Sequence, residues 1–418
     1  MEFAMEHLVV KDVQTLRRVN TITVLDIIRN CGPVARTKLA RMTGLTPATA
    51  FAIVEELVKS GLVREIGLGE SEGGRRPRLY AINPDAPGAM GLEVRGSRVI
   101  AILMDLMGGI KRRHEAPLRS RGQDDVVCAI EAAIEGILGN PETDQENVIG
   151  IGIAMPGILD IDSGIAVSSS NFGWSNLPIC KIISRKFGLP VILEHNVRAF
   201  ALGESWFGAG REVSNLVCIN VGVGISAGII INNELYRGQD GSSGELGHIC
   251  VDEDGPRCGC GGYGCLEALA SEAAILRRAA KAIKQGTSSL IADRESLGDD
   301  DGNLSFSSVV RAAREGDSLA ISLLGEGARY LGIGVAMAVN LLNPELVIIG
   351  GEVTEAWDII FPMIEDAVKT RALKLRPKSI RIVPSSLGIE ASSIGAATLV
   401  LRGVGLLPSL GSAFLQAP

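Results

Sequence analysis

Four side chains able to bind a soft metal ion fall within eighteen residues. His248, Cys258, Cys260 and Cys265 are separated by nine, one and four residues, and glycines between the cysteines let the backbone converge. One imidazole and three thiolates form a complete tetrahedral set for zinc, which leaves no open position for a substrate and favours a structural role. The alternative is a set of buried thiols, or a glycine-rich loop, without metal.

Two carboxylates, Glu245 and Glu267, flank these donors, and we interpret them as groups that the zinc loop holds in place for a polar ligand. The two patterns here, G-E-x-G-H and C-x-C-G-x-x-G-C-x-E, resemble those of the ROK (repressor, ORF, kinase) family of sugar kinases and sugar-responsive repressors. The resemblance implies that Glu245, His248 and Glu267 contact sugar hydroxyls, and that His248 and the three cysteines bind zinc. It also implies a backbone contact at Gly157.

The same resemblance implies an α/β two-lobed, actin-like or hexokinase-like body over about residues 87–405. Its kinases carry E-N-D at the catalytic position, where this chain has Glu194-His195-Asn196. An amide is not basic at neutral pH, so Asn196 can hydrogen-bond a sugar hydroxyl but cannot take its proton. His195 and Asn196 therefore join the predicted sugar ligands.

Both phosphate-binding loops of such a kinase are also altered. Arg95 replaces a glycine where backbone must approach phosphate, and Val223 and Ser226 alter the second loop at 222–228. The sequence predicts that the body binds a sugar without phosphorylating it. Two alternatives are a working ROK kinase that phosphorylates a hexose or N-acetylhexosamine with ATP, and a vestigial pocket in a body that only dimerises.

Length and charge indicate several domains. A chain of 418 residues predicts two to four of them. Residues 1–84 hold 12 Lys or Arg against 9 Asp or Glu, whereas the rest holds 29 against 39, as in a nucleic-acid-binding head on an acidic body. We expect a cytoplasmic protein without a membrane partner, because the N-terminus lacks a signal peptide and the longest apolar-looking stretch, 216–231, is short of a membrane span.

The N-terminal residues predict a small winged helix-turn-helix domain. Helices are expected at 20–30, 36–42 and 46–59, the last with Thr46 as cap and Pro47 in its first turn. Strands at 62–66 and 79–82 enclose a glycine- and arginine-rich wing. Such modules bind double-stranded DNA, although some serve only protein contacts.

The predicted third helix lacks, at its groove-facing positions, the side chains that read guanine and adenine in a bidentate manner. Discrimination is then expected from thymine methyl contacts and from the wing. The residues predicted to contact DNA are Arg36, Lys38, Thr46, Ala48, Thr49, Phe51, Arg75, Arg76 and Arg78.

From residue 89 onwards, strand patterns alternate with helix patterns, which predicts two α/β lobes with a cleft. We divide the chain into a head at 1–83, a linker at 84–88, a sugar-binding body at 89–405 and a tail at 406–418. Strands are expected at 91–94, 99–105, 148–154, 190–193, 215–221, 225–231 and 346–349, and helices at 124–138, 196–206, 266–284, 306–313 and 319–342. Together these features predict a sugar-responsive DNA-binding repressor that forms a homodimer or homotetramer.

Overall fold

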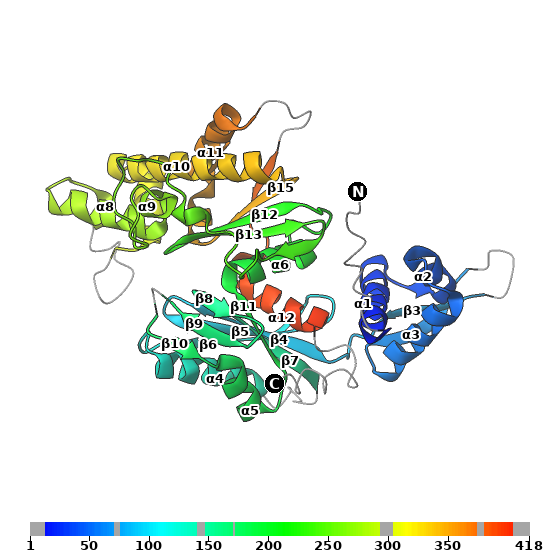
Figure 1. Cartoon of the computed structure of the whole chain (residues 1–418). Helices are drawn as coiled ribbons and strands as arrows, with labels where there is room; N and C mark the ends of the chain where they lie inside the picture. Colours follow the sequence, from blue (N-terminus) through cyan, green and yellow to red (C-terminus); the bar gives the residue numbers. More distant parts are fainter. Residues whose placement is uncertain are drawn as a thin grey trace, which may run out of the picture.

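A computed structural model describes residues 13–70, 76–139, 147–169, 172–292, 304–373 and 380–403 of the chain. A small head and two larger α/β lobes make up the molecule, and helix α1 lies on the side of the head that faces the lobes (Figure 1).

The head is a winged helix-turn-helix. The third helix begins as predicted: the Thr46 hydroxyl accepts a hydrogen bond from the Thr49 amide at 3.2 Å, and Pro47 occupies the first turn. Its buried face is Ala50, Ile53, Val54 and Leu57. The first helix starts at Val13, seven residues before the predicted start at Asn20, because residues 13–19 contain no glycine or proline that would end it. The elements of the head are α1 (Val13–Cys31), β1 (Val34–Ala35), α2 (Arg36–Thr43), α3 (Pro47–Lys59), β2 (Val63–Leu68) and β3 (Arg78–Ile82).

The first lobe is built on a five-stranded sheet of order β11-β7-β4-β5-β6, with parallel pairing on one side of β4 and antiparallel pairing on the other. Helix α4 was predicted from the sequence, whereas helix α5 and the charged strand β6 were not. The elements are β4 (Gly88–Arg95), β5 (Arg98–Met104), β6 (Ile110–Pro117), α4 (Gln123–Leu138), β7 (Val148–Met155), β8 (Ile158–Asp160), β9 (Ile165–Ser168), β10 (Ser175–Leu177), α5 (Ile179–Phe187), β11 (Val191–His195) and α6 (Asn196–Phe207).

The second lobe repeats this plan with a sheet of order β14-β13-β12-β15-β16, again antiparallel on one side of its first strand and parallel on the other. Its strands and 3-10 turns are β12 (Leu216–Val221), β13 (Ile225–Ile231), β14 (Glu234–Tyr236), β15 (Leu346–Gly350), β16 (Arg381–Pro384), η2 (Leu246–His248), η3 (Leu290–Ala292), η5 (Glu352–Ala356) and η6 (Gly388–Glu390). Its helices, together with the final helix of the fold, are α7 (Leu266–Ala270), α8 (Glu272–Lys284), α9 (Phe306–Arg314), α10 (Ser318–Leu342), α11 (Trp357–Arg371) and α12 (Ala391–Gly403).

One predicted helix, 266–284, was wrong as a single element. Ser271 has extended backbone angles and caps the next helix, with its side chain accepting from the Ala274 amide at 3.1 Å, so the segment forms α7 and α8. The strands β8, β9, β10, β14 and β16 and the helices α11 and α12 were not predicted from the sequence.

Helices α6 and α12 cross between the two large sheets (Figure 1). They approach so closely that a side-chain carbon at Gly395 would lie 1.6 Å from the Ala199 carbonyl oxygen, and one at Gly203 would lie 2.5 Å from that of Ala391. The backbones are therefore in direct contact, and the two helices form one closely packed pair.

Within the described residues, α10 alone is long and apolar enough to cross a membrane. It lies in the core of the second lobe, with Leu324, Leu331 and Val335 buried, and 56% of its apolar window is covered by the protein. Its composition is that of a core helix.

Candidate functional site

The four predicted metal ligands come together in the loop between η2 and α7. Donor atoms of His248, Cys258, Cys260 and Cys265 all lie within 4.8 Å of one another. The Cys260 and Cys265 sulfurs are 3.7 Å apart, as are the Cys258 sulfur and His248 Nδ1. Zinc–sulfur bonds of about 2.3 Å in a tetrahedron give sulfur–sulfur edges of about 3.7 Å, so the donors fit zinc.

The His248 ring faces two ways. Its Nδ1 points to the cysteines, whereas Nε2 lies 3.9 Å from a carboxylate oxygen of Glu245. Glu267, in the first turn of α7, accepts a hydrogen bond from the Ile225 amide at 3.0 Å and places its other oxygen 4.0 Å from the Cys258 sulfur. The loop thus brings the G-E-x-G-H carboxylate, the histidine and the G-C-x-E carboxylate to one place.

Gly157, His195 and Asn196 lie at the carboxyl ends of two neighbouring parallel strands. His195 of β11 is paired with Met155 of β7, two residues before Gly157. Gly157 has φ +99°, and a side-chain carbon there would lie 2.3 Å from the Ser168 carbonyl oxygen, so only glycine fits. Ligands of open α/β sheets bind at such strand ends.

A buried ion-pair network that the sequence analysis missed holds this edge in place. Glu194 is fully buried and bonds Arg198 at 2.6 Å and Arg237 at 2.9 Å. Arg237 follows β14 of the second lobe, so the carboxylate ties the end of β11 to the segment that leads into η2. The available signal was the E-x-x-x-R spacing of Glu194, at the end of β11, and Arg198, in the first turn of α6.

His195 is held neutral. Burial lowers its pKa to about 4, with the nearby Arg198 adding to the effect and Glu194 opposing it. Its Nδ1 accepts from the Val197 amide at 3.4 Å, which leaves the proton on Nε2 as a donor. Asn196 accepts from the same amide at 2.9 Å, so its amide nitrogen remains for a ligand. These groups can hydrogen-bond hydroxyls across the pH range of a cell.

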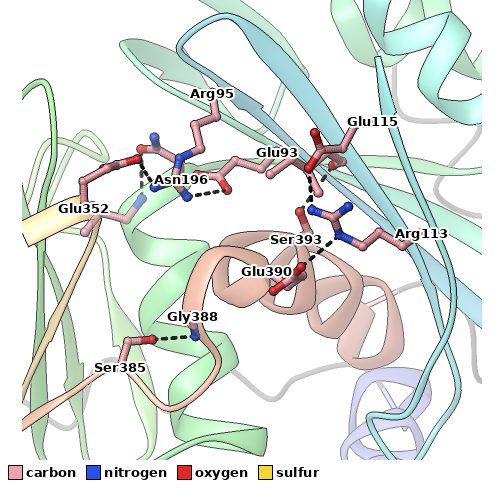
Figure 2. Close-up of polar contacts among 12 residues, drawn as sticks. Glu93, Arg95, Arg113, Glu115, Asn196, Glu352, Ser385, Gly388, Glu390 and Ser393 are labelled. Atoms are coloured by element: carbon pink, nitrogen blue, oxygen red, sulfur yellow. Dashed lines mark hydrogen bonds and ion pairs between the residues drawn. The ribbon is translucent and has the colours of Figure 1, made fainter. Parts of the chain in front are cut away.

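The altered phosphate loops are bridged by an ion pair. Arg95, at the end of β4, reaches across to Glu352 of η5 in the other lobe and lies 3.7 Å from Glu93 (Figure 2). A side-chain carbon at Gly222, the first residue of the second loop, would lie 2.8 Å from a Glu352 oxygen. A carboxylate against this loop repels phosphate, and Arg95 is already neutralised.

Glu93 also makes this place unfavourable for binding a phosphate group. It is buried, one of its oxygens has no hydrogen-bond partner among the described residues, and burial raises its pKa to about 7 although Arg95 opposes the shift. Burial, and then the charge of Glu352, raises the pKa of Glu272, whose amide bonds the Gly222 carbonyl. Three carboxylates thus surround one arginine where a kinase holds ATP phosphates.

The predicted DNA contacts are distributed over α2, α3 and the wing. Lys38, Thr46, Ala48 and Thr49 are exposed. Arg36 and Phe51 are half-buried: the guanidinium lies between the Phe51 and Tyr80 rings, at 5.5 and 4.7 Å, and pairs with Glu55 at 3.5 Å. Arg36 is therefore engaged within the head. Arg76 bonds the Gly69 carbonyl, Arg78 bonds Glu65 at 2.9 Å, and Arg75 lies outside the described residues.

Comparison with known proteins finds a family match for both the head and the body of the chain. The ROK family profile matches residues 89–403, and that of the IclR helix-turn-helix domain matches residues 19–67. The chain belongs to the ROK family. A xylose repressor of Caldicellulosiruptor bescii is 33% identical to it over 94% of this chain and 98% of that protein.

Among ROK structures, one described as a transcriptional regulator homologous to the E. coli MLC protein superposes with a TM-score of 0.82 at 30% identity. It covers 96% of this chain and 99% of its own. A ROK glucokinase from Streptomyces griseus, solved with glucose and AMPPNP, has a TM-score of 0.66 at 31% identity, covering 76% of this chain and 100% of its own. The two-lobed fold predicted for the body is confirmed, and the regulator also matches along the head.

Proposed function

We propose that this protein is a sugar-responsive transcriptional repressor without kinase activity, whose winged head binds operator DNA and whose ROK body binds a sugar as effector. The observation that carries the proposal is the Arg95–Glu352 ion pair, which lies across the phosphate loops of a body that retains the residues predicted to bind sugar. The full-length similarity to a xylose repressor supports the same conclusion. Such a protein works in the cytoplasm.

The sugar site in this proposal combines two edges. Gly157, His195 and Asn196 come from the strand ends of the first lobe, and Glu245, His248 and Glu267 come from the second. Carboxylates accept hydrogen bonds from paired hydroxyls, whereas the neutral His195 and the Asn196 amide nitrogen donate. Because the groups come from two lobes, a bound sugar favours the lobe arrangement in which both sets reach it.

Zinc completes this site as a structural ion. Bound through Nδ1, it leaves the Nε2 proton of His248 facing Glu245 and a ligand hydroxyl, so the metal fixes the tautomer that the sugar requires.

Helix α6 provides the route from the sugar to the head. It begins with Asn196, and its last two residues, Trp206 and Phe207, contact Arg29 of α1 with the guanidinium 4.0 and 5.1 Å from their ring centres. Movement of α6 and α12 on sugar binding therefore reaches the head directly. In a homodimer or homotetramer the two heads read half-sites at a fixed spacing, so a shift of each head weakens operator binding.

The test uses the full-length protein and labelled DNA from upstream of its own coding region. Fluorescence anisotropy should show that one sugar among pentoses, hexoses and N-acetylhexosamines weakens DNA binding by about tenfold or more. Asn196→Ala should bind the DNA normally and lose the response. The same sugars with ATP and Mg²⁺ should give no ADP; turnover in the usual enzyme range of about 1 to 10³ per second would establish the kinase alternative instead.

A further inference from the structure

A polar cleft lies where the head meets the body, at the opposite end of α6 from the proposed sugar site. It is an open cleft with a volume of about 820 Å³, and its walls come from both sides of the junction. Asp26 and Arg29 belong to α1, Trp206 ends α6, Arg211 follows it, and Arg381 and Arg402 belong to β16 and α12. A cleft of this volume is in the range that holds small metabolites.

The cleft is lined by four arginines and three carboxylates, and two of the arginines have no ion-pair partner among the described residues. Asp26 pairs with Arg29 at 3.5 Å, and Glu234 pairs with Arg402 at 3.2 Å. Arg211 and Arg381 are exposed and have no ion-pair partner in the part of the chain that the structure describes, although Glu212 also lines the cleft. Two guanidiniums therefore remain available to a ligand.

Arg29 is the buried member of the set, since its side chain is only 10% exposed. Its Nε and Nη1 are buried without a hydrogen-bond partner in the described structure, and one face of the guanidinium stacks on Trp206. Burial lowers the pKa of Arg29; Asp26 opposes this, while Arg211 and Arg402 lower it further. Like charges held this close together cost folding free energy, and a bound anion removes that cost.

We propose that this cleft is a second ligand site that binds a small phosphorylated anion, with Arg211 and Arg381 as its donors and the buried charge of Arg29 adding to the attraction. Planar guanidiniums match phosphate oxygens in a bidentate manner, and the volume exceeds that of free phosphate, leaving room for an attached organic group. Because the walls belong to head and body, the ligand holds α1 against the end of α6. Binding itself does not rest on the proposed repressor function; only its effect on DNA affinity does.

The experiment titrates the full-length protein with inorganic phosphate, pyrophosphate, a hexose 6-phosphate and a nucleoside monophosphate, following heat and tryptophan fluorescence. We expect saturable binding of one anion per chain, with the strongest binder identifying the organic part. Arg211→Gln with Arg381→Gln should weaken it at least tenfold. The matched control is Arg119→Gln with Arg185→Gln, two exposed arginines of the first lobe.

Each result decides the matter. Equal loss in the control pair, or weak unsaturable binding, would mean an adventitious ion only and overturn the proposal. Asn196→Ala should leave phosphate affinity unchanged, whereas its loss there would place the anion in the sugar site instead. A protein that binds phosphate in this cleft but shows no sugar-dependent DNA binding would refute the repressor proposal and keep this one.

Discussion

At the scale of single residues, His248 joins two kinds of chemistry. Its Nδ1 faces the Cys258 sulfur and its Nε2 faces Glu245, so one ring serves the metal and the proposed sugar site at once. The resemblance of the two motifs to those of the ROK family implied this double role. The direction in which each nitrogen points depends on the packing of the loop, which no spacing encodes.

This geometry predicts that metal and sugar binding are coupled. Cys260→Ser or Cys265→Ser should lose the zinc and the sugar affinity together, because the ring that donates to the sugar is no longer fixed. Glu267→Gln should keep the metal and weaken sugar binding by about 10- to 100-fold, through the loss of charged hydrogen bonds. Elemental analysis and calorimetry on the same variants measure both quantities.

Cys250 provides the matched control for this prediction. Its backbone pairs with that of Cys265 in an isolated antiparallel β-bridge, and its thiol is free and outside the four-donor set. Cys250→Ser should therefore retain both the zinc and the sugar. Full sugar affinity in a zinc-free Cys260→Ser protein would contradict the coupling and leave the metal as a staple of the loop alone.

Other contacts between residues could not be predicted from the sequence. Arg95 was identified as an obstacle to phosphate, but its partner Glu352 is more than 250 positions away and was not predicted. Neither Arg29 nor Trp206 belongs to a motif, and their stacking arises only when the head docks on the body. Pairings between distant segments depend on tertiary structure and leave no local signal.

At the scale of elements, the predictions were best where local rules decide. Thr46 and Pro47 fix the start of α3, and α6 begins at Asn196 as predicted. The predictions failed where a single residue ends one helix and begins the next, as Ser271 does between α7 and α8. The small-residue helix α12 was missed because its glycine and alanine face suits contact with α6 and produces little amphipathic pattern.

The wing is the element whose role is easiest to measure. Arg76 and Arg78 are exposed at its base, and contacts from them to DNA phosphates would add counterion release to binding. Arg76→Ala with Arg78→Gln should weaken binding to all DNA sequences to a similar extent. It should also flatten the plot of log affinity against log salt by up to about 0.9 per lost phosphate contact.

The control for this salt titration is the Arg119→Gln, Arg185→Gln protein. It loses the same two positive charges, but from the first lobe and not from the head. An unchanged slope in the wing variant would show that the wing does not lie on DNA. A wild-type protein with no DNA affinity at low salt would favour the alternative in which the head makes protein contacts.

At the scale of the whole molecule, one helix joins the proposed effector site to the head. The N-terminal residue of α6 is Asn196, and its C-terminal turn carries Trp206 against Arg29. Arg402 of α12 approaches the same indole at 5.5 Å, so both central helices end at this contact. Because α6 and α12 touch backbone to backbone, a displacement at one end is carried to the other with little loss.

Trp206→Ala should therefore separate sensing from response. The variant should bind the sugar with nearly normal affinity, since the ligand groups lie at the other end of α6, and should bind operator DNA in its absence. The sugar should then change DNA affinity by less than about twofold, against about tenfold in the wild type. Trp357→Ala is the matched control, because it removes a stacked tryptophan, 4.9 Å from Phe361, in the second lobe. If Trp206→Ala responds to sugar as fully as the control does, the signal does not pass through α6, and the linker between head and body becomes the route to examine.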